Sequence, residues 1–292
     1  MTWYSIINQT LSGLSGGMIV FCCALGLTIA FGTLKVLNLA HGAIFMAGMY
    51  FCYSVAETIT SSNGFFFALI VALLVSAMLG GIMEYLLLRP TYSRIILDQF
   101  MVTFGAVFII SEGIKFIWGT GYKTIAAPQF LRGAVNLFGI VYPLYPLLII
   151  VFGILLYIAV YLFFEKTKWG VVLRGVTVDR EMVGAFGINV PRVFTLTFML
   201  ACALSGLGGA LMGPMSTVAL GIDGSILLQS FIVIVIGGFG SITGAFLGSI
   251  LFGLVNSFGI LVLPKMAIGF PFFLMLIVLL VRPYGLLGKP IK

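Results

Sequence analysis

The chain has 292 residues, of which 61% are hydrophobic and only 8% are charged, and its mean hydropathy is +1.23. A soluble domain needs about a quarter of its residues charged to cover its surface, so this composition excludes a soluble protein. The formal net charge of +7 does not indicate nucleic-acid binding, because the basic residues stand mostly beside the ends of apolar segments, where they orient a membrane protein.

Apolar segments of about 20 residues, the length that a helix needs to cross the hydrocarbon core, follow one another along the chain. They are continuously apolar and do not alternate, which favours helices over the strands of a membrane barrel. The sequence therefore predicts an all-α polytopic membrane protein with eight or nine transmembrane helices in a single domain, residues 1–292. The predicted spans are residues 12–32, 40–59, 65–88, 101–118, 141–164, 193–213, 225–240, 241–263 and 266–281.

Two of these spans have unusual features. Residues 1–34 contain neither Lys nor Arg, whereas a cleavable signal peptide carries a positive n-region. We therefore expect the first span to remain as a membrane helix. The seventh span, near 225–240, is short and bounded by glycines, so it could be broken or re-entrant instead of crossing fully.

A few polar residues lie within the spans, where they are costly and often functional. Asn38 and His41 are three residues apart and share one helical face near the predicted inner end of the second span. They could form a hydrogen-bonded helix start at the cytoplasmic interface. They could also belong to a gate on a transport path, for which Gly42 and Gln229 are further candidates. Gln229 and Asn256 could line such a path or bridge two helices.

Residue types that carry chemistry are sparse. His41 is the only histidine and the acids do not cluster, so no metal site is predicted. The four cysteines lie inside apolar segments without CxxC spacing, which predicts buried thiols. Glu84 lies near a span end, where an acid can reach the interface. The chain has no catalytic motif and no phosphate-binding loop, so we predict that it is not an enzyme, binds no cofactor and does not hydrolyse ATP by itself.

The basic residues are distributed unevenly between the two predicted sides of the membrane. If all nine spans cross and the N-terminus is outside, 11 of the 15 lysines and arginines fall on the inner side. The positive-inside rule favours this orientation, which also places the C-terminus inside. The polar segment 165–192 is then a cytoplasmic loop.

This cytoplasmic loop, 165–192, contains a predicted short helix. Thr177 can cap it, Asp179 and Glu181 fall in its first turn, and Gly187 supplies a left-handed stop. Nine helical residues span about 14 Å, which is too short to be stable alone in water. The helix therefore needs a groove in a partner, or it could lie on the bilayer surface. Its acids weaken the bilayer alternative, because surface helices favour uniformly basic polar faces.

The same helix carries an apolar stripe with helical spacing, at positions i, i+4, i+5 and i+8. These residues are Val178, Met182, Val183 and Phe186. The residues that we expect to couple the chain to a soluble partner are Arg174, Thr177, Asp179, Arg180, Glu181, Met182, Val183, Phe186 and Gly187.

Small residues mark a face for close helix packing. Gly240, Gly244 and Gly248 recur every four residues, and such spacing lets the backbones of membrane helices approach one another. This face could pack within one subunit, or it could slide during gating or meet a second subunit.

Three separated motifs resemble those of the permease subunits of branched-chain (hydrophobic) amino acid ABC importers, and of their close relatives for urea and short amides. The first is Val36-Leu37-Asn38-Leu39-Ala40-His41-Gly42, and the second is the loop from Arg174 to Pro191. The third is Ile236-Gly237-Gly238-Phe239-Gly240-Ser241-Ile242-Thr243-Gly244-Ala245, followed by Arg282-Pro283-Tyr284-Gly285-Leu286-Leu287-Gly288.

The resemblance implies an importer in the inner membrane of a prokaryote, built from two permease subunits, two cytoplasmic ATPase subunits that use the ATP, and an extracytoplasmic solute-binding protein. It implies that the permease core is a heterodimer and that the 177–187 helix docks on an ATPase. A urea or short-amide permease is the nearest alternative. An ion-coupled secondary transporter or channel is an alternative of another class, but it predicts ionisable residues at mid-membrane, and these are nearly absent.

Overall fold

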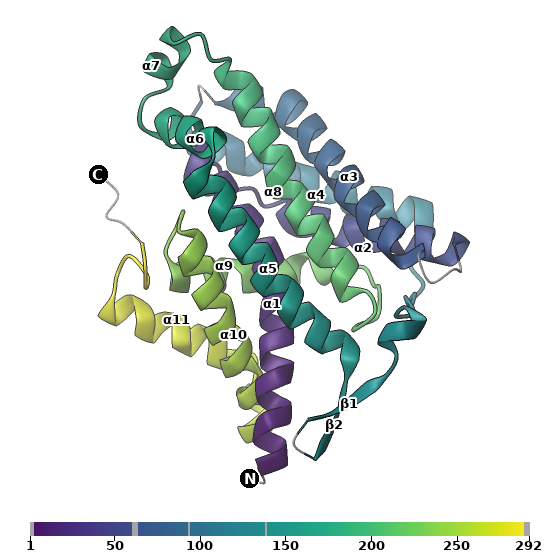
Figure 1. Cartoon of the computed structure of the whole chain (residues 1–292). Helices are drawn as coiled ribbons and strands as arrows, with labels where there is room; N and C mark the ends of the chain where they lie inside the picture. The colour runs from purple at the N-terminus through teal and green to yellow at the C-terminus, as the bar shows by residue number, and fades with distance from the viewer. Residues whose placement is uncertain (1–2, 60–63, 93, 138, 289–292) are drawn as a thin grey trace.

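The computed structural model describes residues 3–59, 64–92, 94–137 and 139–288, which form a bundle of helices (Figure 1). The α-helices are α1 (Trp3–Leu34), α2 (His41–Thr58), α3 (Gly64–Met83), α4 (Ile96–Trp118), α5 (Leu144–Lys166), α6 (Lys168–Val178), α7 (Arg180–Ala185), α8 (Val190–Met212), α9 (Ile222–Gly237), α10 (Ile242–Val262) and α11 (Gly269–Val281). A π-helical turn, Glu84–Leu88, continues α3 and leads into the 3-10 turn Arg89–Thr91. Two further 3-10 turns are Gln129–Leu131 and Pro264–Met266.

The chain is an all-α polytopic membrane protein, as its composition predicts. Six helical segments among the described residues are long and apolar enough to cross a membrane: α1, α3 with the two turns that follow it, α4, α5, α8 and α10. Of the other helices, α9 and α11 are apolar but shorter. The 16 residues of α9 extend about 24 Å along its axis, less than the roughly 30 Å of the hydrocarbon core. The count of eight or nine spans therefore stays a prediction.

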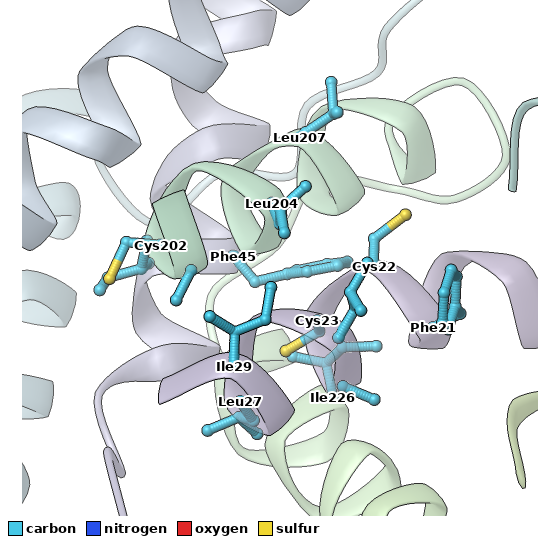
Figure 2. Close-up of a cluster of buried hydrophobic side chains, with 14 of the residues drawn as sticks. Phe21, Cys22, Cys23, Leu27, Ile29, Phe45, Cys202, Leu204, Leu207 and Ile226 are labelled. Atoms are coloured by element: carbon cyan, nitrogen blue, oxygen red, sulfur yellow. The ribbon is translucent and has the colours of Figure 1, made fainter. Parts of the chain in front are cut away.

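The core of the bundle is formed by α1, α2 and α8. These three helices contact one another, with α3 and α4 packed on one side and α9, α10 and α11 on the other (Figure 1). Figure 2 shows the interior, where Cys22 and Cys23 of α1, Phe45 of α2, Leu204 of α8 and Ile226 of α9 lie close together. All four cysteines are buried and unpaired, as predicted. By contrast, most of the apolar surface of α4 and α5 is exposed, as expected for helices that face lipid.

A two-stranded hairpin precedes α5, where the sequence predicts the start of a span at residue 141. Strands β1 (Ala134–Leu137) and β2 (Ile140–Pro143) pair in antiparallel fashion, with Val135 opposite Tyr142. Gly139 takes a left-handed φ of 84°, which suits a tight turn. The predicted start is therefore wrong by three residues, because an apolar strand end and an apolar helix start cannot be distinguished by hydropathy. The hairpin and the N-terminal end of α1 lie at one end of the bundle, and α6 and α7 lie at the opposite end (Figure 1).

The second helix begins inside the bundle and not at its end. Gly26 of α1 lies beside His41 and Ala201, and Gly26 is eight residues before the end of α1 at Leu34. Eight residues correspond to about 12 Å along a helix. His41 therefore lies about 12 Å inside the end of α1, and its position relative to the cytoplasmic interface stays a prediction. The non-helical residues 35–40 return into the bundle before α2 starts, and hydropathy alone does not reveal such a return.

Candidate coupling helix and transport path

The predicted cytoplasmic loop forms two helices instead of one. Thr177 lies inside the last turn of α6, where its hydroxyl donates to the Leu173 carbonyl at 2.8 Å. Asp179 has an extended backbone and caps α7, accepting from the backbone N–H of Met182 at 2.9 Å. The predicted cap at Thr177 and the continuous 177–187 helix are therefore wrong. A threonine can bond back to a carbonyl within a helix, whereas Asp179 is the better cap of the two.

The predicted left-handed stop at Gly187, after α7, is confirmed. Gly187 has a φ of 79°, the left-handed conformation that terminates a helix without strain. The next helix follows at once, because Asn189 caps α8 by accepting from the backbone N–H of Arg192 at 3.1 Å. Pro191 occupies the first turn of α8, where its missing N–H costs nothing.

The four residues of the predicted apolar stripe do not share one environment. Val178 is 89% exposed, Met182 57% and Phe186 77%, whereas Val183 is only 9% exposed. Val183 packs against Gly175 of α6, where a Cβ would lie 3.1 Å from the Val183 Cγ2. Val183 therefore holds α7 against α6. We call Val178, Met182 and Phe186 the exposed stripe, because only these three are available to a partner.

Two of the predicted coupling residues bond to the bundle itself. The Arg180 guanidinium lies 4.8 Å from the ring centroid of Phe194 in α8, and it donates to the Leu34 carbonyl at 3.4 Å. Arg174 donates to the Phe164 carbonyl at 2.6 Å and lies 3.6 Å from the Glu165 carboxylate. Arg180 thus joins α7 to the ends of α1 and α8, and Arg174 joins α6 to the end of α5.

A buried carboxylate lies near this junction, at the π-helical turn after α3. Glu84 accepts from Thr195 at 2.7 Å, from the Tyr92 hydroxyl at 3.1 Å and from Arg89 at 3.3 Å. The Glu84 side chain is fully buried, so the expectation that it reaches the interface is wrong. Burial and then the Glu84 charge raise the pKa of Tyr92, which keeps its hydroxyl protonated as a donor. Sequence spacing does not reveal this cluster, because Thr195 comes from α8.

Asn38 and His41 form a hydrogen-bonded start for α2. The Asn38 side-chain oxygen accepts from the Ala40 backbone N–H at 3.0 Å, and its amide nitrogen lies 3.5 Å from His41 Nδ1. The hydroxyl of Ser205 in α8 donates to the His41 carbonyl at 3.0 Å. Both Asn38 and His41 are fully buried. Gly42 packs on the Asp223 carbonyl of α9, where any side chain would overlap it.

Gln229, the fourth candidate for the path, lies elsewhere. It lines a cavity of about 220 Å³ together with Gln9 and Ser12 of α1 and Asn256 and Ser257 of α10, whereas Asn38, His41 and Gly42 do not line it. The structure thus separates the predicted gate residues into two groups. Asn38, His41 and Gly42 are buried in the core, whereas Gln229 borders the open cavity.

The predicted glycine face lies between α9 and α10. Gly244 is in contact with the backbone of Gly237, and a Cβ on Gly248 would lie 2.6 Å from the Val233 carbonyl oxygen. Gly240 precedes α10 and takes a φ of 75° in the turn between the two helices, where it faces Gly32 of α1. It therefore supports the turn and is not part of a helical stripe.

Comparison with known proteins agrees with this architecture. Residues 9–279 match the family model described as branched-chain amino acid transport system / permease component. The chain belongs to this family. It is 28% identical to the high-affinity branched-chain amino acid transport system permease protein BraD of Pseudomonas aeruginosa, over 98% of this chain and 97% of BraD. No solved structure matches it.

Two further relatives extend the comparison. The chain is 25% identical to the high-affinity branched-chain amino acid transport system permease protein LivH of Escherichia coli (strain K12), over 97% of this chain and 96% of the relative. It is 29% identical to the probable branched-chain amino acid transport permease protein LivH of Methanocaldococcus jannaschii, over 91% of this chain and 87% of the relative. The family is one of transport permeases, so this chain is a component of a transport system.

Proposed function

We propose that this chain is the permease subunit of an ATP-binding-cassette importer that moves branched-chain amino acids across the inner membrane of a prokaryote. It works with a second, non-identical permease subunit, two cytoplasmic ATPase subunits and an extracytoplasmic solute-binding protein. The relatives that cover nearly the whole chain support this proposal, because they are named for branched-chain amino acid transport.

In this proposal the N-terminus is outside and the C-terminus is inside. The distribution of 11 of the 15 lysines and arginines on the inner side supports this orientation. The end of the bundle that carries α6 and α7 then faces the cytoplasm, and the β1–β2 hairpin faces outward (Figure 1).

The exposed stripe along α6 and α7 is the observation that carries the coupling role. Val178, Met182 and Phe186 are apolar and exposed, yet they lie in a polar segment at the end of the bundle (Figure 1). Exposed apolar side chains grouped in a polar segment are typical of a surface that binds another protein. An ATPase subunit supplies the partner surface, and Arg180 passes the motion of α7 to α8.

The test is a double substitution, Met182→Asp with Phe186→Asp, in a chain co-expressed with its ATPase subunits. Both side chains point away from the permease, so the variant should insert in the membrane normally. We expect it to lose ATPase co-purification and the uptake of labelled leucine. Tyr122→Asp is the matched control, because Tyr122 is an exposed aromatic residue (82%) in the predicted outer loop and should retain the ATPase.

Two outcomes would contradict the proposal in different ways. If the double variant still binds the ATPase and imports leucine, α7 is not the coupling helix. If the unmodified chain imports leucine without any ATPase subunit, the protein is a secondary transporter or channel.

A further inference from the structure

A cavity beside α1 has a partly polar lining. It has a volume of about 220 Å³ and is open on one side. An ordered water needs only about 10–15 Å³ of such space, so the cavity is much larger than a structural water site. Three carboxamides and two hydroxyls border it, from Gln9, Gln229, Asn256, Ser12 and Ser257.

Close contact between α1 and α10 shapes the cavity. A Cβ on Gly13 would lie 2.8 Å from the Gly253 carbonyl oxygen, so the two backbones touch at this crossing. Gly13 and Gly253 both line the cavity, and Val20, Phe252 and Ile260 supply an apolar wall beside the polar groups. The arrangement combines a polar side with an apolar side, as small-molecule sites usually do.

Two of the five polar side chains that line the cavity have no hydrogen-bond partner among the described residues. Ser257 donates its hydroxyl toward Gln9, whose side-chain and backbone oxygens both lie at 2.8 Å. The side chains of Gln229 and Asn256 form no hydrogen bond with any residue that the structure describes. A carboxamide exposed to hydrocarbon without a partner is strongly unfavourable. Gln229 and Asn256 therefore face water or a polar ligand.

We propose that this cavity is a solute-binding subsite on the transport path, and that it takes a small neutral or zwitterionic molecule with an apolar side chain. The inference rests on the proposed function and names where in the permease the solute binds. A carboxamide both donates and accepts hydrogen bonds, so Gln229 and Asn256 can bind a carboxylate and an ammonium group of one molecule. Among the residues that line the cavity none is ionisable, so a solute with a net charge would find no counter-charge there.

Cysteine labelling tests whether the cavity is wet and occupied. Gly16 lines the cavity and has open space where a Cβ would lie, so Gly16→Cys should be tolerated, and the native cysteines are all buried. In the assembled transporter in vesicles, we expect a charged, membrane-impermeant thiol reagent to label Gly16→Cys, and leucine to slow this labelling several-fold. Lysine and aspartate should not slow it. Gly105→Cys, at an exposed glycine of α4 with open space, should not be labelled because it faces lipid.

A second measurement does not depend on an introduced thiol. Gln229→Leu combined with Asn256→Leu should lower leucine uptake at least ten-fold while the second permease and the ATPase subunits still co-purify. The control Asn136→Leu removes an exposed carboxamide from β1 and should leave uptake unchanged.

The outcomes separate the two proposals. If the unmodified complex imports leucine but Gly16→Cys resists labelling, or leucine does not protect it, the subsite is wrong and the proposed function stands. The same holds if the double leucine variant imports leucine at the unmodified rate. If the unmodified complex imports no branched-chain amino acid, the proposed function itself fails.

Discussion

The guanidinium of Arg180 lies over the ring of Phe194, with 4.8 Å between the guanidinium carbon and the ring centroid. Phe194 meets the ring of Tyr92 edge to face at 5.4 Å, and the Tyr92 hydroxyl bonds to Glu84 at 3.1 Å. Consecutive contacts thus connect α7 to the π-helical turn that follows α3. Such turns inside helices are frequent at functional sites, and this one is connected to α7 through Phe194 and Tyr92.

The contact between Arg180 and Phe194 predicts a defect in coupling without a defect in docking. Phe194→Leu removes the ring face, which costs about 1–2 kcal/mol in lost cation–π attraction and packing. The exposed stripe is untouched, so the ATPase should still co-purify, but leucine uptake per ATP hydrolysed should fall several-fold. Uptake and phosphate release measured in the same vesicles give this ratio.

Phe51→Leu is the control for that experiment. Phe51 packs edge to face on Trp118 at 5.1 Å, away from α7. The Phe51→Leu substitution should lower the free energy of unfolding by about as much as Phe194→Leu does. It should leave the ratio of leucine uptake to ATP hydrolysis unchanged. An equal fall of the ratio in both variants would show that Phe194 acts through stability alone.

The Glu84 cluster predicts a stability defect. Glu84→Gln replaces an acceptor of three hydrogen bonds by an amide and leaves the Arg89 charge without its partner. We expect a loss of about 2–3 kcal/mol, less than for a fully buried pair because the Arg89 side chain is 34% exposed. Thermal unfolding in detergent measures it. Glu112→Gln breaks an exposed pair with Lys115 and should change stability by no more than about 0.5 kcal/mol.

Val183 and Phe186 predict opposite phenotypes although they belong to one predicted stripe. Val183→Asp places a charge in the contact with Gly175, so it should detach α7 and make the loop sensitive to protease. Phe186→Asp should leave protease resistance unchanged and weaken only ATPase binding. Limited proteolysis of the permease alone distinguishes them, and equal sensitivity of the two variants would refute the separate roles.

The contact between α9 and α10 predicts which glycines tolerate a methyl group. Gly248→Ala places a Cβ 2.6 Å from the Val233 carbonyl oxygen, so the helices must separate, at a cost of about 1–3 kcal/mol. Gly224→Ala, in the first turn of α9 with open space around it, should be neutral or stabilising by up to about 1 kcal/mol. Thermal unfolding of both variants compares them directly.

Hydropathy and charge predict much of this fold, because both act locally along the chain. Long apolar helices, buried cysteines and the left-handed stop at Gly187 follow from composition and residue type. The start of α2 does not, since residues 35–40 are no more polar than a helix end and their return into the bundle depends on contacts with α8. The cap of α7 is similarly ambiguous, because Thr177 and Asp179 are both capping residues two positions apart.

The candidate sites depend more on tertiary contacts, and the sequence predicts them less well. Helical spacing places Val183 and Phe186 on neighbouring positions of one stripe, but only the packing of α7 on α6 shows which of them is covered. Glu84 appears as an ordinary span-end acid until Thr195, more than a hundred residues later, is brought beside it. Gln229 has no distinctive neighbours in the sequence, and only the convergence of α1, α9 and α10 groups it with Asn256.

The internal start of α2 has a consequence for biogenesis. Its first residue contacts α8, because the Ser205 hydroxyl donates to the His41 carbonyl and Gly26 beside His41 packs against Ala201. Ser205 and Ala201 belong to α8, which leaves the ribosome well over a hundred residues after α2. Chains are synthesised from the N-terminus, so α1 and α2 exist before their α8 partners. The surroundings of His41 are therefore completed only after α8 has been made, late in the synthesis of the chain.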